Sequence, residues 1–310
     1  MHTKSFSSIL ASPFTLLGKL SETRGWAYYL IIPSLFLILL VVIYPLFSGI
    51  SLSFQEKRLT RPDKDAYIGL EHYRELLKDD EFWLSLKNTG EWVVVGAISQ
   101  FLLGLCTALA LNRSGWLTKL ISVIVLLPWI LPSVVAANIW ALLLDPRLGV
   151  LNDILVKIGA LDSYFAWFAN PDTALPAALV VELWRGFPFF SLMLLAGLQG
   201  IPEDLYEAAA VDGASPWSKL RFITMPMLKP VIIAAVILRV ISLVNSPDTL
   251  LILTNGGPGH ATEVLSLYAF QTAYASFDFG YAGALSVVMF AILMAFTALY
   301  VFASGGVTED

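Results

Sequence analysis

The sequence predicts an all-α integral membrane protein with six transmembrane helices. Of its 310 residues, 57% are hydrophobic and only 14% are charged, whereas an ordinary soluble domain is about 25% charged. Six apolar runs approach or exceed the roughly 20 residues that cross the hydrocarbon core. Each run is expected to be helical, because backbone amides in lipid find no water to bind. The runs cover residues 26–54, 92–112, 120–144, 174–198, 226–245 and 279–304.

The first run begins at Trp26, behind a tail that holds Lys4, Lys19 and Arg24. It is too long for the hydrophobic region of a signal peptide, which has about 7–15 residues. We therefore expect no cleavable signal, and we predict that the first span is retained behind an N-terminal tail of residues 1–25.

The second and third runs contain no charged residue. The chain's single cysteine, Cys106, lies in the second run, which excludes a disulfide framework and favours a small buried hydrophobic side chain. Prolines within or beside the runs predict kinks or helix starts, because proline lacks a backbone N–H. These prolines are Pro45, Pro128, Pro132 and Pro188. The sixth run is followed by a predicted C-terminal tail, residues 305–310.

The fourth and fifth runs contain ionisable residues, which cost a few kcal/mol each inside a membrane. Glu182 and Arg185 are three residues apart, so they share a helix face and can pair. Arg239 lies near the middle of the fifth run, and Lys229 lies near one end, where it can reach the interface. Two interpretations remain open: pairing that fixes helix packing, or a polar wall along a translocation path.

Aromatic faces and hydroxyl-binding polar groups together are typical of sugar sites. Several residues in or beside the third, fourth and fifth runs have this character and are candidates to line a path or contact a solute. The candidates are Asn138, Trp140, Glu182, Trp184, Arg185, Arg239, Asn245 and Asp248.

Charge distribution gives a first indication of orientation. If the N-terminus is cytoplasmic, the inside segments hold many of the basic residues, as the positive-inside rule expects. Loop 246–278 then lies outside and holds no Lys or Arg, and loop 146–173 holds only two. Loop 55–91 also lies outside and is rich in both residues, which contradicts the rule. Charge alone therefore leaves the orientation open.

The polar segment between the fourth and fifth runs predicts two short helices joined by a turn. Pro202 suits a helix start, and acidic residues follow it. Asp212-Gly213 is a turn or C-cap signal. Ser215-Pro216 is typical of an N-cap followed by the first position of a helix.

This segment contains the string EAAAVDGA, residues 207–214, and then Ile223-Thr-Met-Pro226. It resembles the EAA loop of binding-protein-dependent ABC importer permeases, with Met225 where the family has Leu. The resemblance implies that loop 203–226 is cytoplasmic and that its coupling helix sits in a groove of an ATP-hydrolysing subunit, which places the N-terminus inside as well. The residues implied in ATPase coupling are Glu207, Ala208, Ala209, Asp212, Gly213 and Ala214.

The resemblance extends from about Tyr44 to Phe302 and is closest to the carbohydrate branch, the maltose and glycerol-phosphate type. Its most branch-specific element is Gly256-Gly257-Pro258. One departure is His72, where that branch commonly has Asn. An outer contact for a solute-binding protein is expected at Asn255, Gly256, Gly257 and Pro258.

The resemblance implies a permease subunit that forms half of the path for a sugar, polyol or glycoside in a bacterial inner membrane. The implied partners are a second, homologous permease, two ATPase subunits, membrane lipid, and a periplasmic or lipid-anchored binding protein. Both termini are expected in the cytoplasm. No cofactor is expected in this chain, since ATP and Mg would bind the ATPase.

Other function classes find little support in the sequence. The net charge of −5 gives no reason to expect nucleic acid. The chain has no G-x-x-x-x-G-K-[ST] string, no G-x-S-x-G string and no metal-ligand spacing among its histidines, so an enzyme is not expected. The alternative is a secondary transporter driven by an ion gradient. That class favours internal inverted repeats, and no clear repeat is present. The sequence does not identify the solute.

Overall fold

The structure is a computed structural model that describes residues 26–61, 63, 65–113 and 115–305, with side chains described from residue 31 onward. The predicted N-terminal tail and most of the predicted C-terminal tail lie outside these residues. The described chain is mostly helical, with one two-stranded antiparallel sheet, in which β1 (Gln55–Glu56) pairs with β2 (Ala66–Tyr67).

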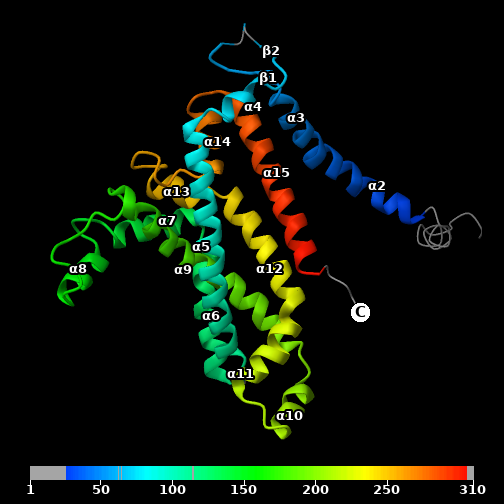
Figure 1. Ribbon diagram of the computed structural model, residues 1–310, viewed down its shortest axis with the longest axis vertical. Helices are drawn as coiled ribbons and strands as arrows, with labels where there is room; N and C mark the ends of the chain where they lie inside the picture. Colours follow the sequence, from blue (N-terminus) through cyan, green and yellow to red (C-terminus); the bar gives the residue numbers. More distant parts are fainter. Residues whose placement is uncertain (1–25, 62, 64, 114, 306–310) are drawn as a thin grey trace, which may run out of the picture.

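The long helices form an elongated bundle (Figure 1). Its central members are α5 (Asp80–Leu111), α9 (Pro171–Gln199), α12 (Met225–Asn245) and α15 (Phe279–Ala303). The remaining helices are shorter. They are α2 (Trp26–Ile38), α3 (Tyr44–Leu52), α4 (Glu71–Leu76), α6 (Trp116–Ile130), α7 (Ser133–Leu143), α8 (Val150–Lys157), α10 (Glu203–Val211), α11 (Pro216–Lys219), α13 (Asp248–Leu253) and α14 (Leu265–Tyr274). Two π-helical turns, Leu39–Ile43 and Leu220–Thr224, join α2 to α3 and α11 to α12.

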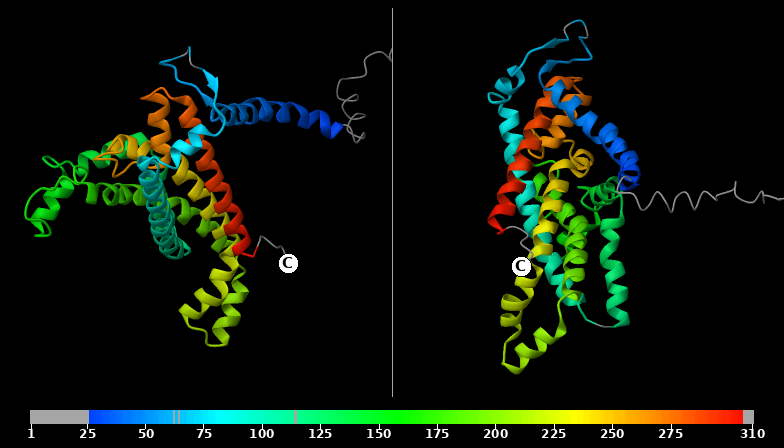
Figure 2. Two further views of the ribbon diagram at one scale, coloured as in Figure 1. Left: turned by 45° about the horizontal axis from the view of Figure 1, so that its top comes forward. Right: turned by 90° about the vertical axis from the view of Figure 1, so that its right-hand side faces the viewer.

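Two ends of the molecule can be distinguished. Helices α10 and α11 project at one end, called here the α10 end, and the β1–β2 hairpin with α4 and α14 lies at the other (Figure 1). The N-terminal helices α2 and α3 form an arm: α3 packs against α15, and α2 extends away from the bundle, as Figure 1 and the left view of Figure 2 show. None of the arm's most apolar stretch is buried.

Five helical segments of the described chain are long and apolar enough to cross a membrane. The bent pair α6 and α7 makes a sixth if it is counted as one span. The axes of α6 and α7 differ by 95°, so the prediction of one helical span over residues 120–144 is corrected. Leu131 is extended, as a residue before proline prefers, and α7 starts behind Pro132.

The buried core runs along the contacts between α5, α9 and α12. Near the α10 end it consists of buried side chains such as Phe190, Leu194 and Leu228, and further along of Trp92 and Leu243. Much of the remaining surface is apolar, including large exposed side chains on α3, α6 and α15. Cys106 is also exposed on the surface of the single chain, so the expectation of a buried side chain is wrong there. Such an extensive apolar surface is expected of a protein whose solvent is lipid.

Candidate functional site

The segment between α9 and α12 folds as two short helices at the tip of the molecule (Figure 1). Helix α10 ends in a tight C-cap, in which the amide of Gly213 donates to the carbonyl of Ala210 and that of Ala214 donates to the carbonyl of Ala209. Gly213 has φ of +75°, which glycine adopts without strain. The Ser215 side chain then accepts a hydrogen bond from the Ser218 amide and caps α11.

The helix pair presents an exposed and partly apolar surface. Val211 is 89% exposed, Trp217 68% and Phe222 70%. One anchor holds α10 to the bundle: the hydroxyl groups of Tyr206 and Thr224 are 2.9 Å apart. Apolar side chains that remain exposed beside a small, alanine-rich helix are typical of a surface that contacts another protein. The six coupling candidates, Glu207, Ala208, Ala209, Asp212, Gly213 and Ala214, all lie in α10 or in the turn that follows it.

A buried polar network lies midway along the bundle and is centred on Glu182 of α9, which is 1% exposed. Arg185 donates to both carboxylate oxygens, from Nε at 3.1 Å and from Nη2 at 3.0 Å. Arg239 of α12 also forms an ion pair with this carboxylate. The hydroxyl of Thr249 in α13 donates to Oε2 of Glu182 at 3.2 Å. One carboxylate therefore joins three helices.

Gln100 of α5 completes the network. Its amide nitrogen donates to the backbone carbonyl of Glu182 at 3.0 Å, and its amide oxygen accepts a hydrogen bond from Nε of Arg239. Gly186 makes room for this arrangement, since a Cβ atom there would lie 2.3 Å from Nη2 of Arg239. In this network every buried charge has partners, as a low-dielectric interior requires.

The remaining path candidates do not join the network. Asn138 and Asn245 are exposed, and each donates to a carbonyl of its own helix. Asp248 accepts a hydrogen bond from Ser133 of α7 at 3.3 Å. The structure thus brings three of the eight candidates, Glu182, Arg185 and Arg239, into one cluster.

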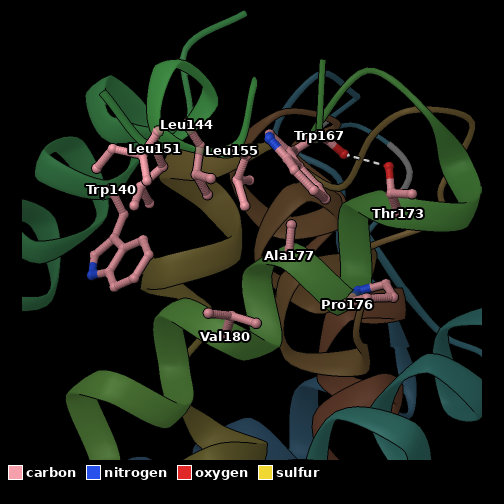
Figure 3. A pocket seen from close by; sticks show the side chains of 10 residues that line it. Trp140, Leu144, Leu151, Leu155, Trp167, Thr173, Pro176, Ala177 and Val180 are labelled. Carbon is pink, nitrogen blue, oxygen red and sulfur yellow. Dashed lines mark hydrogen bonds between the residues drawn. The ribbon is translucent and has the colours of Figure 1, made fainter. Parts of the chain in front are cut away.

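Trp140 lines an apolar pocket of about 310 Å³ between α7, α8 and α9 (Figure 3). Its ring meets that of Trp184 edge to face, with 5.8 Å between centroids. The opposite wall includes Trp167, whose carbonyl accepts a hydrogen bond from the Thr173 hydroxyl at 2.8 Å. Trp140 therefore lies against an apolar cavity, and its contact with a solute stays a prediction.

The loop that contains the predicted binding-protein contact, Asn255 to Pro258, connects α13 with α14. It is fixed by hydrogen bonds: Gln271 donates to the backbone and side-chain oxygens of Asn255, and Thr262 donates to the carbonyl of Gly257 at 2.9 Å. From α5, the Asn88 side chain donates to the carbonyls of His260 and Glu263. The loop is thus preformed and attached to α5.

His260 links this loop to the start of α5. Its Nδ1 lies 2.5 Å from the buried Glu263 carboxylate, and its Nε2 lies 3.5 Å from Glu81. The hydrogen bond to Glu263 raises the pKa of the His260 imidazole. Burial raises the pKa of the Glu263 carboxyl, and the His260 contact opposes this effect.

Sequence reasoning missed Gln100, Thr249 and Glu263. Gln100 had a detectable signal, because it is a polar residue inside an apolar run. Thr249 and Glu263 are ordinary loop residues by sequence, and only the packing of α13 and of the following loop buries them.

A family model described as "binding-protein-dependent transport system inner membrane component" matches residues 100–307. The trehalose/maltose transport system permease protein MalF of Thermococcus litoralis is 38% identical over 273 residues, which cover 88% of this chain and 91% of that protein. The sulfoquinovosyl glycerol transport system permease protein SmoG of Agrobacterium fabrum is 36% identical over 277 residues, 89% of each chain.

Among solved structures, a chain of a bacterial ABC transporter for import of the acidic polysaccharide alginate superposes with a TM-score of 0.80 at 23% identity. The match covers 95% of this chain and all of that one, so the two share a fold. The family model and the two permease relatives favour the importer permease over a secondary transporter driven by an ion gradient. The chain belongs to the family of inner membrane components of binding-protein-dependent transport systems, the permeases of ABC importers.

Proposed function

We propose that this chain forms one half of the translocation path of an importer for a sugar, polyol or glycoside. Two similar relatives are named for trehalose or maltose and for sulfoquinovosyl glycerol, which supports a carbohydrate-like solute. In this proposal the chain pairs with a second, homologous permease, because six spans are too few to enclose a large polar solute. The bent pair α6 and α7 counts as the third of the six spans.

The observation that carries the proposal is the exposed α10–α11 pair at the tip of the molecule. We place this end in the cytoplasm, where α10 enters a groove on one of two ATPase subunits. ATP and Mg bind those subunits, and closure of the ATPase pair displaces α10. The opposite end, with the Asn255–Pro258 loop, faces a periplasmic or lipid-anchored binding protein. This chain carries out no covalent chemistry.

A labelling experiment tests the proposal. Ser215→Cys, in a Cys106→Ser background, is expected to resist a membrane-impermeant maleimide in intact cells and to react in inverted vesicles. Assembly with the ATPase subunits is expected to protect it. Reaction from the outer face of intact cells would refute the orientation, and unprotected reaction in the assembled complex would refute the docking.

Ala209→Trp provides a second test. Ala209 is half-buried on α10, so a bulky ring there obstructs close seating against the ATPase while the transmembrane helices stay unchanged. We expect the variant to reach the membrane at normal levels and to lose ATPase stimulation by the binding protein. Normal stimulation would mean that α10 is only a connector.

A further inference from the structure

Helices α9 and α12 are the two long helices joined by the α10–α11 pair, so a displacement of α10 reaches the rest of the molecule through them. Toward the α10 end they pack through buried apolar side chains, including Leu194, Leu198 and Leu228. Apolar contact is non-directional. Close packing nevertheless holds the two helices in one register, and the buried polar network adds a directional constraint to it.

The network around Glu182 supplies this constraint. Glu182 lies about 25 Å from the end of α9, and Arg239 about 21 Å from the start of α12, at 1.5 Å per residue. The two side chains, 1% and 4% exposed, form an ion pair between these helices. Because Arg239 is buried and its carboxylate partner lies on the other helix, sliding either helix by one turn would separate Arg239 from that partner, whereas Glu182 would keep Arg185 of its own helix.

The same carboxylate reaches toward the end of the molecule opposite α10. Thr249 donates to it from the start of α13, and α13 leads directly into the loop of residues 254–264. The neighbouring Asp248 contacts Ser133 of α7. A continuous line of contacts therefore runs from α10 through α9 and α12 to Glu182, and from there to α13 and its loop.

We propose that Glu182 and Arg239 are positioning residues that transmit the displacement of α10 to α13 and to the 254–264 loop. This inference rests on the proposed function. It assigns the buried charges to coupling within the membrane, and it does not require them to touch the solute.

The test uses the assembled transporter in lipid nanodiscs, with ATP and vanadate as the driving ligands, so it does not depend on knowing the solute. The reporter is Ala261→Cys in a Cys106→Ser background, since Ala261 is a small, half-exposed residue of the loop. In otherwise unaltered protein, ATP and vanadate are expected to change the maleimide reaction rate at this position by about tenfold, within the range of coupling between distant sites.

Glu182→Gln and Arg239→Gln are each expected to abolish this change, while the Ser215→Cys position stays protected by the ATPase subunits. The matched control is Thr107→Val on α5, whose hydroxyl bonds to the carbonyl of Leu103 in its own helix. The control is expected to respond like the unaltered protein. A full response at Ala261→Cys in either charge variant would overturn the inference, as would the absence of a response in the unaltered protein.

If the charge variants do not assemble, Glu182→Asp and Arg239→Lys replace them. Both keep the charge: aspartate shortens the side chain, and lysine replaces the guanidinium by a single ammonium group. A reduced response with normal assembly supports the inference, and a full response in both overturns it. Lack of protection at Ser215→Cys in the unaltered complex would instead refute the proposed function, so the two failures are distinguishable.

Discussion

Gly186 lies where two side chains of the polar network pass the backbone of α9. A Cβ atom at this position would lie 2.3 Å from Nη2 of Arg239 and 2.4 Å from the amide oxygen of Gln100. We predict that Gly186→Ala displaces both side chains and lowers the free energy of unfolding by about 1–3 kcal/mol, the usual effect of overpacking a tight interior. The measurement is the thermal unfolding midpoint in detergent.

Gly90→Ala on α5 is the matched control, because nothing lies within 4 Å of a Cβ atom built there. Alanine has the higher helix propensity, so this variant is expected to unfold at the same temperature or higher. Equal midpoints for the two variants would show that the network tolerates displacement.

The pairing of Glu182 with Arg185 was accessible from sequence, because residues three apart share a helix face. The convergence of Arg239 and Thr249 on the same carboxylate, and the contacts of Gln100 with Arg239 and with the Glu182 carbonyl, were not. They depend on how α5, α12 and α13 pack on α9, and the spacing along the chain contains no information about the rotation of one helix relative to another. The contacts show that the charges pair between helices, and their role as a polar wall of the translocation path stays a prediction.

Among the elements, the end of α10 depends on one backbone conformation. Gly213 has φ of +75°, and nothing lies within 4 Å of a Cβ atom built there, so a side chain would be strained by conformation rather than by crowding. We predict that Gly213→Val costs about 1–2 kcal/mol locally and frays the C-terminal turn of α10. The measurement is hydrogen exchange of the amides of Gly213 and Ala214.

Gly213→Asn is the matched comparison, since asparagine tolerates the left-handed region better than valine does. It is expected to keep slow exchange at Ala214 and to retain ATPase stimulation by the binding protein. Equally fast exchange in both variants would mean that the C-cap requires glycine itself.

Local signals predicted the α10–α11 boundaries well. Ser215 caps α11 with Pro216 behind it, and Gly213 ends α10, because caps depend on a few neighbouring residues. Hydropathy was less informative about helix ends. Helix α5 begins at Asp80, well before the apolar run, because Asp79 caps it by accepting from the Glu81 amide.

The loop between α13 and α14 is predicted to respond to pH through His260. The folded protein raises the pKa of this imidazole through its hydrogen bond to Glu263. The resulting stabilisation is present below the unfolded pKa of about 6.5 and is lost as the pH rises through the raised pKa of the folded state. Hydrogen exchange of residues 254–264 is therefore expected to speed up, beyond its intrinsic pH dependence, as the pH rises above about 6.5.

His260→Gln is expected to remove most of this excess pH dependence, because the amide does not titrate. Ser276→Ala, which alters a non-titrating residue that lines a surface pocket together with His260, is expected to retain it. An unchanged pH profile in His260→Gln would assign the effect to another group.

At the scale of the whole molecule, the basic residues are distributed unevenly between its two ends. Arg113, Lys119, Lys219 and Arg221 flank helices that reach the α10 end, whereas loop 246–278 has no Lys or Arg. The basic loop 55–91, which contradicts the positive-inside rule, includes residues with structural partners. Lys57 pairs with Asp65, and Arg58 pairs with Asp278 at 2.7 Å. The first pair lies within the loop that joins β1 to β2, and the second joins this loop to the start of α15.

The number of crossings determines where the N-terminus lies. If α12 and α15 each cross the membrane once, α10 and the end of α15 lie on the same side. The N-terminus is separated from α10 by the α2–α3 arm, α5, the bent pair and α9. Four crossings put it on the α10 side, whereas three would put it on the other.

We predict four crossings, because the pair is long and apolar enough to count as one span and four crossings leave both α10 and the basic tail on the side that the positive-inside rule favours. In a Cys106→Ser background, Ser7→Cys and Ser215→Cys are then expected to be inert to an impermeant maleimide in intact cells and reactive in inverted vesicles. Ala261→Cys is the control that reacts from outside. Reaction of Ser7→Cys in intact cells, with Ser215→Cys still inert, would refute the prediction of four crossings between the N-terminus and α10.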